Sequence, residues 1–449
     1  MIKLIPGSAV AIIGIGRVGR IITHYLMHNK INVYAYDDNI KVFTADENQQ
    51  FVRNVYFKII SRKQWPITNL KPKFAIVSPG LPEQASIIRF LETQQIPIID
   101  EIEFTSAMVK NPIIAITGTN GKSTATVLLG KILAAAGQNV FWGGNLAPGL
   151  PFATSLFQEP KDTYIIEVSS FQLSRCHHFH PHIAVITNIT ADHLDRHVTF
   201  SEYQKSKFRI FSTQKKNDYA ILNHEDESSM KFKHTILSKV LYFSRKQYVN
   251  GVYLKNNKIF FKNSEVCSLN DIKLFGKHYL DSVLAVITAA KILNINNRII
   301  TKVLRTFTGL EHRLQFLRQH AGIKYINNSM CTNPVAAAAT LESFTKPVIL
   351  IAGGKEKNLD PTVYIKAMTR KAKFVVLFGE NQNHLSHALK THHYHKCQKV
   401  DTIKEAVLTA KKKAAPDDVI LFSPGFASFD KYRNFQERGL AFSKIVYAI

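Results

Sequence analysis

Residues 116–124 read Ile-Thr-Gly-Thr-Asn-Gly-Lys-Ser-Thr, and they decide the fold that we expect. An apolar run over 113–116 predicts a buried strand before this loop, and apolar residues at helical spacing over 127–136 predict a helix after it. A glycine-rich loop between a strand and a helix presents free backbone N–H groups and the positive end of the helix dipole to an anion. The stretch therefore predicts an α/β domain that binds phosphate.

The side chains of this loop suit a nucleoside triphosphate. Lys122 adds a cation on a flexible stem, and the hydroxyl of Ser123 can hold a magnesium ion. Gly118 and Gly121 lie closer together than in the common G-x-x-x-x-G-K-[ST] pattern. A chance Gly-Lys-Ser in a turn is the alternative, and the flanking strand and helix argue against it. The predicted nucleotide-binding residues are Gly118, Thr119, Asn120, Gly121, Lys122, Ser123 and Thr124.

Size and composition limit the class of protein. The chain has 449 residues, enough for two to four domains, with 45% apolar and 20% charged residues, as in soluble globular proteins. No apolar run is long enough to cross a bilayer and the N-terminus is no secretory signal, so we expect no membrane insertion and a cytoplasmic location. The spacing of the cysteines suggests neither a zinc site nor a disulfide framework. They are Cys176, Cys267, Cys331 and Cys397.

The net charge of +25 and the pI near 9.7 raise the question of nucleic-acid binding. The lysines are spread along the chain, without a long basic run or an aromatic-studded basic stripe. A compositional bias, or attraction of small anionic substrates, explains the charge better. We expect no nucleic-acid partner.

The N-terminal region has its own glycine-rich turn. An apolar strand over 10–13 precedes Gly14-Ile15-Gly16-Arg17-Val18-Gly19, a helix pattern follows over 21–27, and a strand over 33–36 ends at Asp37. This layout is typical of a dinucleotide-binding turn with a ribose-reading acid and, taken alone, would suggest an NAD enzyme. Any βαβ unit that holds a diphosphate needs the same small residues. A further strand over 74–77 ends in a loop containing Ser78 and Gly80.

Strands alternate with helices along the rest of the chain. Central strands are expected at 164–168 and 183–186, and C-terminal strands at 348–352, 374–378 and 419–422. The segment 242–270 looks hairpin-like, with turns at Asn250-Gly251 and Asn256-Asn257. We therefore predict three α/β domains: a Rossmann-like domain over 1–108, a central P-loop ATPase-type domain with a mostly parallel sheet over 109–308, and a Rossmann-like domain over 309–449.

Three polar residues of the central region are candidates for chemistry. Glu167 follows an apolar strand and could coordinate magnesium bound to ATP phosphates, or be a helix-capping or surface acid. His193, between Asp192 and Asp195, could be a second metal ligand or a structural histidine. Lys207 lies four residues after Tyr203 on an expected helix, where solvated lysines are the norm.

Several stretches besides the loop carry a family resemblance. They are 143–145 (Gly-Gly-Asn), 167–173 (Glu-Val-Ser-Ser-Phe-Gln-Leu), 192–197 (Asp-His-Leu-Asp-Arg-His), 423–430 (Ser-Pro-Gly-Phe-Ala-Ser-Phe-Asp) and 434–439 (Asn-Phe-Gln-Glu-Arg-Gly). Together they resemble the Mur ligases of peptidoglycan synthesis, in the right order over nearly the whole chain. The C-terminal run resembles the branch of that family that adds D-glutamate.

The resemblance implies a reaction. ATP phosphorylates the alanine carboxylate of a UDP-linked muramoyl substrate, and the amine of D-glutamate attacks the acyl phosphate. Two magnesium ions and Lys122 would offset charge on the transferring phosphoryl group. The implied metal ligands are Ser123, Glu167, His193 and Lys207, with Lys207 carbamylated. The partners are then small molecules, and we expect a monomer.

The resemblance also assigns binding residues. It gives Arg313 to the nucleotide and Asn145 to the UDP-linked substrate, and it turns the N-terminal glycine turn into a UDP site. The UDP-site residues are Gly14, Gly16, Asp37, Ser78 and Gly80. The residues matching the D-glutamate pocket are Thr332, Lys357, Ser428 and Phe435, of which Lys357 would pair with a substrate carboxylate.

Some positions depart from the family pattern. The Asn-Asp-Ser-Lys-Ala-Thr-Asn motif stands here as Asn-Asn-Ser-Met-Cys-Thr-Asn over 327–333, so the acid is Asn328 and the lysine Met330. A neutral thioether cannot offset charge. Tyr279 and Ser282 replace a pair of asparagines.

The family resemblance leaves alternatives open. One is a related amide ligase with another amino acid or acceptor, such as a folylpolyglutamate synthase. Another, suggested by Asn328, Met330 and Tyr279, is a nucleotide-binding homologue without turnover. An NAD oxidoreductase leaves the phosphate loop unexplained.

Overall fold

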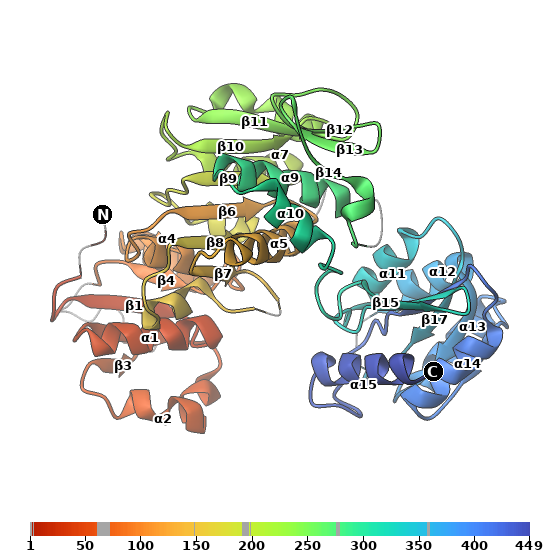
Figure 1. The fold of residues 1–449 in the computed structure, drawn as a ribbon. Helices are drawn as coiled ribbons and strands as arrows, with labels where there is room; N and C mark the ends of the chain where they lie inside the picture. The colour runs from red at the N-terminus through yellow and green to blue at the C-terminus, as the bar shows by residue number, and fades with distance from the viewer. Residues whose placement is uncertain are drawn as a thin grey trace. The chain divides into compact units, whose positions relative to one another are not determined.

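The computed structural model describes residues 2, 4–60, 72–147, 149–190, 197, 199–274, 279–356 and 360–449. These residues form three β-sheets flanked by helices (Figure 1), which confirms the predicted α/β class. By its internal contacts the chain divides into two compact units. The first comprises 1–272 with 277–305, and the second comprises 273–276 with 306–449.

The N-terminal sheet is entirely parallel, with the strand order β3-β2-β1-β4-β5. Its strands are β1 (Ala9–Ile13), β2 (Asn32–Tyr36), β3 (Phe57–Ile59), β4 (Ala75–Val77) and β5 (Ile98–Ile99). Its helices are α1 (Arg17–His28), η1 (Ile40–Thr44), α2 (Asp46–Val52), α3 (Ser86–Thr93) and α4 (Glu101–Ser106). Every residue of β1 is buried, as expected for a strand that helices cover on both faces. The βαβ unit predicted from 10–36 is confirmed.

The central sheet has nine strands in the order β14-β13-β12-β11-β10-β9-β6-β8-β7. Its strands are β6 (Ile113–Thr117), β7 (Val140–Gly144), β8 (Thr163–Glu167), β9 (Ile183–Ile186), β10 (Tyr219–Asn223), β11 (Lys239–Ser244), β12 (Gly251–Lys255), β13 (Lys258–Phe261) and β14 (Ser264–Ser268). Its helices are α5 (Lys122–Ala135), η3 (Phe152–Phe157), α6 (Ser170–Ser174), α7 (Phe200–Phe208), η4 (Arg209–Phe211), α8 (Glu227–Lys231), η5 (Lys233–Thr235), η6 (Leu269–Asp271), α9 (Leu280–Ile292) and α10 (Asn297–Leu304). Helix α5 packs beside α9 and α10, as Figure 1 shows.

The edge of the central sheet differs in part from the hairpin prediction. A hairpin does turn at Asn256-Asn257, both with positive φ, and joins the antiparallel strands β12 and β13. The turn expected at Asn250-Gly251 is wrong, because β11 and β12 run parallel. Gly251 is needed for another reason: a Cβ there would lie 1.9 Å from the carbonyl oxygen of Tyr242 on the neighbouring strand.

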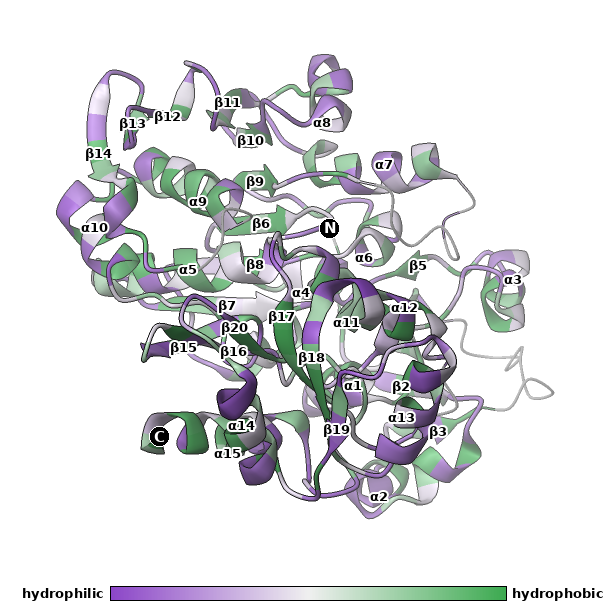
Figure 2. Ribbon diagram, turned by 90° about the vertical axis from the view of Figure 1, so that its right-hand side faces the viewer, coloured by the Kyte–Doolittle hydropathy of each residue, from purple (hydrophilic) through white to green (hydrophobic). Residues whose placement is uncertain are grey.

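The C-terminal sheet forms the core of the second unit, in the order β15-β16-β20-β17-β18-β19. Its strands are β15 (Gln315–His320), β16 (Ile323–Asn327), β17 (Val348–Ala352), β18 (Ala372–Leu377), β19 (Cys397–Lys399) and β20 (Val419–Phe422). Its helices are α11 (Pro334–Glu342), α12 (Thr362–Lys371), α13 (Gln382–Thr391), α14 (Ile403–Lys413) and α15 (Phe435–Ala448). Only β15 runs antiparallel. Figure 2 shows β17 as strongly hydrophobic, which matches its complete burial between helices.

The strand order of the central sheet brings distant loops together. Strand β6 lies between β8 and β9, and all three are parallel. The loops that follow β6, β8 and β9 therefore meet at one edge of the sheet, which is where ligands bind in open α/β sheets. These are the loops that carry the phosphate-binding stretch, Glu167 and the 187–190 segment.

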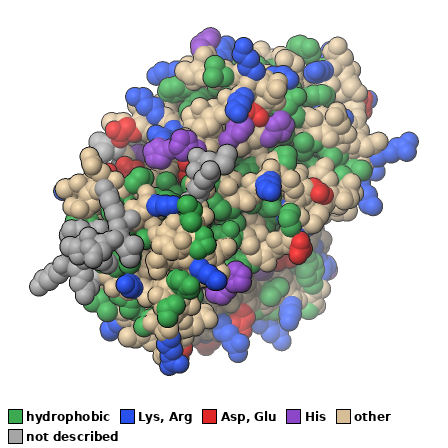
Figure 3. All heavy atoms as spheres, turned by 90° about the vertical axis from the view of Figure 1, so that its left-hand side faces the viewer, with side chains coloured by type: hydrophobic (Ala, Val, Ile, Leu, Met, Phe, Trp, Pro, Cys, Tyr) green, Lys and Arg blue, Asp and Glu red, His purple; other side chains and the backbone are tan. Residues whose placement is uncertain are grey.

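The described helices bear on the question of a membrane span, and the face drawn in Figure 3 bears on that of a basic stripe. Within the described ranges no helix combines the length and apolarity needed to cross a bilayer. Figure 3 shows lysine and arginine side chains scattered over the face it presents, with acidic and apolar residues between them. All four cysteines are free thiols.

Candidate active site

Two glycines allow the phosphate loop to fold against its neighbours. Gly118 has a φ of +148°, and a Cβ there would lie 2.0 Å from Oγ1 of Thr187. Gly121 has a φ of +84° at the start of α5, and its Cβ would lie 2.3 Å from Oγ of Ser282. Because real Cβ atoms do not come this close to other atoms, a side chain at either position requires that the facing hydroxyl group or the loop moves, and the positive φ is strained as well.

The end of strand β9 holds the loop in place. The backbone N–H of Thr119 donates to the carbonyl of Asn188 at 2.8 Å, and that of Asn120 donates to Asn188 Oδ1 at 2.9 Å. The Thr187 hydroxyl donates to the carbonyl of Asn120 at 2.6 Å. Neither Thr187 nor Asn188 was predicted from the sequence, although two polar residues directly after an apolar strand were a signal for them.

The cations of the site lie at the loop itself. Nζ of Lys122 donates to the carbonyls of Gly118 and Thr119, each at 2.9 Å, so the ammonium group sits over the loop. Ser123 and Thr124 are buried in the first turn of α5. This turn combines the dipole of a 14-residue helix with a lysine, which is a strong attractor for phosphate.

Glu167 ends strand β8 beside the loop and is only 3% exposed. Its Oε1 accepts a hydrogen bond from Nδ2 of Asn145 at 3.3 Å, so the structure brings these two predicted residues together. Its Oε2 is buried and has no hydrogen-bond partner within the described part of the chain. A buried carboxylate oxygen without a donor is suited to a cation, since such a group is otherwise costly to bury.

The other predicted metal ligands are only partly covered. The described residues contain no group of three His, Cys, Asp or Glu side chains arranged to bind a metal ion. His193 lies outside the described residues. His197 of the same stretch is buried, stacks on Phe171 and bonds to the Ser170 hydroxyl at 3.0 Å.

Lys207 lies at the phosphate loop, although it comes from a distant helix. It is 2% exposed, and its Nζ donates to the Gly118 carbonyl at 2.8 Å. The ring of Tyr203, one turn earlier on α7, lies 4.7 Å from this nitrogen, and the Tyr203 hydroxyl bonds to Thr119 Oγ1 at 3.0 Å. The interpretation of Lys207 as a solvated lysine is therefore wrong, because α7 packs this side chain onto the loop.

The predicted residues of the N-terminal sheet also gather at one edge. The Asp37 carboxylate accepts hydrogen bonds from the backbone N–H of Ile15 and of Asn39, both at 2.9 Å, and so shapes the glycine turn. Gly14 has a φ of +94°, and its Cβ would lie 2.9 Å from Cβ of Ser78. The turn that begins at Gly14 and the loop after β4 are therefore adjacent.

A buried arginine holds the predicted amino-acid pocket of the second unit. Arg438 is fully buried and donates to the carbonyls of Phe426 and Ala427 and to the hydroxyl and carbonyl of Ser329. Burial lowers its pKa to about 10. Its acceptors Phe426 and Ala427 immediately precede Ser428, and Ser329 lies three residues before Thr332. The Ser329 hydroxyl donates to the carbonyl of Phe435 at 2.8 Å. The sequence analysis did not single out this arginine.

Two further predicted ligand residues are Lys357 and Arg313. Lys357 lies outside the described residues. Arg313 is described and forms a β-bridge with Leu310 in the second unit. It belongs to a different unit from the phosphate loop, so its role in nucleotide binding stays a prediction.

The departures from the family pattern have structural roles. The side-chain amide of Asn328 donates to the hydroxyls of Ser423 at 3.1 Å and Thr340 at 3.4 Å. Ser282 is buried and donates to the Gly121 carbonyl at 3.3 Å, so it packs against the phosphate loop. Tyr279 directly precedes α9, and Met330 is partly exposed.

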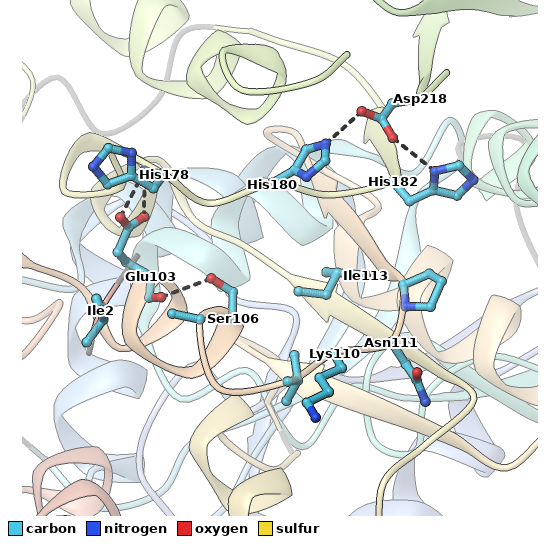
Figure 4. A pocket seen from close by; sticks show the side chains of 13 residues that line it. Ile2, Glu103, Ser106, Lys110, Asn111, Ile113, His178, His180, His182 and Asp218 are labelled. Carbon is cyan, nitrogen blue, oxygen red and sulfur yellow. Dashed lines mark hydrogen bonds and ion pairs between the residues drawn. The ribbon is translucent and has the colours of Figure 1, made fainter. Parts of the chain in front are cut away.

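A cavity lies at the opposite edge of the central sheet from the phosphate loop (Figure 4). It measures about 510 Å³ and lies at the amino ends of β6, β9 and β10. Both of its carboxylates accept hydrogen bonds: Asp218 accepts from His180 at 2.7 Å and from His182 at 3.0 Å, and Glu103 accepts from the backbone N–H of His178. None of the residues predicted for catalysis lines this cavity.

The fold and the site at the carboxyl ends of β6, β8 and β9 define a P-loop nucleotide-binding protein with a buried carboxylate and a buried lysine at the phosphate loop. Family models agree with this description. The model "Mur ligase middle domain" matches residues 116–290, and "Mur ligase, glutamate ligase domain" matches residues 312–426.

Relatives and solved structures support the same family. The chain is 34% identical to the UDP-N-acetylmuramoylalanine–D-glutamate ligase of Pelotomaculum thermopropionicum and 35% identical to that of Alkaliphilus metalliredigens, over at least 99% of each chain. Among solved structures, UDP-N-acetylmuramate–alanine ligase from Thermotoga maritima has a TM-score of 0.56 at 18% identity, covering 98% of this chain and 99% of that one. MurF ligase of the same organism in complex with ADP has a TM-score of 0.55 at 13% identity, covering 99% and 96%. The chain belongs to the Mur ligase family, and within it to the group of UDP-N-acetylmuramoylalanine–D-glutamate ligases.

Proposed function

We propose that this chain is an ATP-dependent ligase that joins D-glutamate to the alanine carboxylate of UDP-N-acetylmuramoyl-L-alanine, in the cytoplasmic synthesis of peptidoglycan precursors. One observation carries the chemical part of the proposal. The phosphate loop, the buried carboxylate of Glu167 and the buried amine of Lys207 converge at one edge of the central sheet. Full-length identity to enzymes named for this reaction supports the choice of substrates.

The reaction has two steps. In the first, an oxygen of the alanine carboxylate attacks the γ-phosphorus of ATP, which yields an acyl phosphate and ADP. In the second, the amine of D-glutamate attacks the acyl carbon, the tetrahedral intermediate expels inorganic phosphate, and the nitrogen loses a proton to give the amide. Phosphoryl transfer is catalysed mainly by positioning and by charge stabilisation. Lys122 and the loop N–H groups supply positive charge at the phosphates.

Glu167 and Ser123 suit magnesium, and the unpartnered Oε2 of Glu167 is the observation that fits it. Together with His193 and Lys207 they would hold two ions, which neutralise charge on the phosphate oxygens when bound. We infer that Lys207 carries a carbamate. The ammonium group would first lose one proton. The resulting amine would then bond to the carbon of carbon dioxide and lose a second proton, so a cation becomes an anion. The uncharged lysine amine is the nucleophile that this reaction needs.

The remaining sites complete the proposal. Residues 1–108 would bind the UDP part of the substrate, 109–308 would bind ATP, and 309–449 would bind D-glutamate. The UDP-site residues are Gly14, Gly16, Asp37, Ser78, Gly80 and Asn145. The D-glutamate residues are Thr332, Lys357, Ser428 and Phe435, and Arg313 contacts the nucleotide. The chain would act as a monomer.

One assay tests the function. Phosphate release from ATP is measured with UDP-N-acetylmuramoyl-L-alanine, with and without D-glutamate, and the amide product is identified by mass. Release that requires D-glutamate is the expected result. Release with a different amino acid would point to a related amide ligase, and nucleotide binding without release would overturn the catalytic assignment.

A further inference from the structure

Arg175 links the two substrate sites of the first unit. It follows helix α6, which begins three residues after Glu167, and its side chain is 7% exposed. Its guanidinium reaches into the N-terminal sheet, where Nη1 donates to the carbonyl of Ser78 at 3.1 Å and Nη2 donates to that of Leu81 at 2.8 Å. Both acceptors belong to the loop after strand β4.

This loop is a tight turn, and Arg175 holds its outer side. The N–H of Leu81 donates to the Ser78 carbonyl at 3.0 Å, so that carbonyl accepts from the turn and from Arg175 together. On its inner side the N–H of Ser78 donates to the carbonyl of Ile13 at 2.9 Å, directly before Gly14. Gly80 is exposed at the tip of the turn. The turn therefore begins at Ser78, beside the glycine turn that follows β1.

The other end of α6 is attached to the phosphate-binding edge. Ser169 and Gln172 form a capping box at the start of the helix, with Ser169 Oγ accepting from the N–H of Gln172 at 3.2 Å. The residue before the cap, Val168, accepts from the hydroxyl of Thr117 at 2.7 Å and donates to the carbonyl of Ile116 at 2.9 Å. A short capped helix thus spans the distance between Glu167 and the arginine.

The segment after Arg175 is also anchored to the N-terminal sheet. The Glu103 carboxylate on α4 accepts hydrogen bonds from the backbone N–H groups of His177 and His178, at 3.1 and 2.8 Å. Asp100, the fully buried N-cap of α4, lies close enough to attract the guanidinium. The arginine is therefore held from several directions, and a guanidinium held in this way keeps its two donors in a constant geometry.

We propose that Arg175 is a positioning residue for the UDP-linked substrate: it holds the 78–81 turn in the shape that binds the diphosphate, at a constant distance from Glu167. The inference rests on the proposed function, because it takes this turn as part of the UDP site. A charge-assisted hydrogen bond to a backbone carbonyl is stronger than a neutral one, and two parallel bonds also fix orientation. Lysine could not replace both bonds, since its single ammonium does not have the planar fork of arginine.

The test compares UDP and ADP binding to the full-length chain by calorimetry. Arg175→Lys and Arg175→Ala should each weaken UDP binding about tenfold, while ADP binding stays within about twofold. Arg209→Lys is the matched control: Arg209 donates at 2.9 Å to the carbonyl of Cys176, next to Arg175 in sequence, and forms no described bond to the 78–81 turn. The control should leave both affinities unchanged.

The outcomes separate this inference from the proposed function. Unchanged UDP affinity in Arg175→Lys would overturn the positioning role, and so would an equal loss of UDP and ADP binding, which would indicate general damage to the fold. Arg175→Lys decides the matter if the alanine variant does not fold. A wild-type chain that bound UDP without D-glutamate-dependent turnover would contradict the proposed function and leave the comparison of affinities valid.

Discussion

Replacing Glu167 with glutamine should lower activity and raise stability at the same time. The side chain is 3% exposed, its Oε1 is bonded to Asn145, and its Oε2 has no partner within the described residues. Glutamine has the same shape and retains an oxygen for Asn145, but it removes the negative charge. We expect kcat/KM to fall about 100-fold or more, or ~2.7 kcal/mol of transition-state stabilisation, as when other charge-stabilising groups are removed.

The gain in stability follows from the same oxygen. A buried group without a partner costs about 1–3 kcal/mol when it is neutral and more when it is charged. Glutamine leaves an unpartnered amide nitrogen in place of Oε2, so the expected gain is the difference between these two costs. The variant should therefore be about 1 kcal/mol more stable than wild type without magnesium, which corresponds to ~2–4 °C in melting temperature for a large domain. Magnesium should stabilise the wild type by binding its native state, and should stabilise the variant much less.

Glu101 provides a matched control, because it is a second buried glutamate. Burial, with a smaller contribution from Asp100, raises its pKa to about 8, so it is mostly protonated at pH 7. Its carboxyl accepts from the backbone N–H of Ala153. Glu101→Gln mimics that protonated acid, so activity at pH 7 should stay within about twofold of wild type.

Phosphate release and thermal melting with and without magnesium measure both effects. Near-normal kcat/KM in Glu167→Gln would refute the magnesium role, and a lower melting temperature in the metal-free variant would refute the argument from the unpartnered oxygen.

Three further predictions follow from buried contacts. Gly118→Ala should weaken ADP binding at least about tenfold by calorimetry, because its Cβ would meet Thr187. Gly137 also has positive φ but has open space around it, so the control Gly137→Ala should cost only about 1 kcal/mol of stability and leave ADP affinity unchanged. Equal ADP affinity in both variants would contradict this. Arg438→Lys should raise the KM for D-glutamate about tenfold with little change for ATP, and an unchanged KM would show that the arginine does not shape the pocket. Burial raises the pKa values of Asp100 and Glu101 to about 7 and about 8, so the folded chain retains protons that the unfolded chain has lost, and stability should fall by up to about 1.4 kcal/mol per pH unit for each group between roughly pH 5 and 7. The double variant Asp100→Asn, Glu101→Gln should flatten this slope in urea unfolding; an unchanged slope would contradict the assignment.

Strands that are continuous apolar runs could be predicted from the sequence. Strands β9, β17 and β20 begin and end where their apolar runs do, since buried parallel strands need apolar residues on both faces. Glu167 could be predicted for the same reason, because it is the first charged residue after such a run. The parallel pairing of Gly251 with Tyr242 could not, since an Asn-Gly dipeptide is typical of a hairpin turn and the pairing depends on the rest of the sheet.

Contacts between distant segments could not be predicted from the sequence. Thr187 and Asn188 hold the phosphate loop only because β9 lies next to β6. The order of strands in a sheet depends on the whole domain and cannot be predicted from one segment. Arg175 and Arg438 bond mainly to backbone carbonyls. Because every residue has a backbone carbonyl, the amino-acid sequence does not show which residues accept these bonds. Asn328 had a clear signal, but it was interpreted only as a lost acid, whereas its amide is buried and bonds to the hydroxyl of Ser423.

The most direct test of the account is the transfer of label from the substrate carboxylate. With 18O in the alanine carboxylate of UDP-N-acetylmuramoyl-L-alanine, the account predicts one labelled oxygen in each inorganic phosphate that is released in a D-glutamate-dependent reaction, because that oxygen is phosphorylated and then leaves with the phosphate. Unlabelled phosphate formed at the same rate with or without D-glutamate would contradict carboxylate activation by ATP at this site.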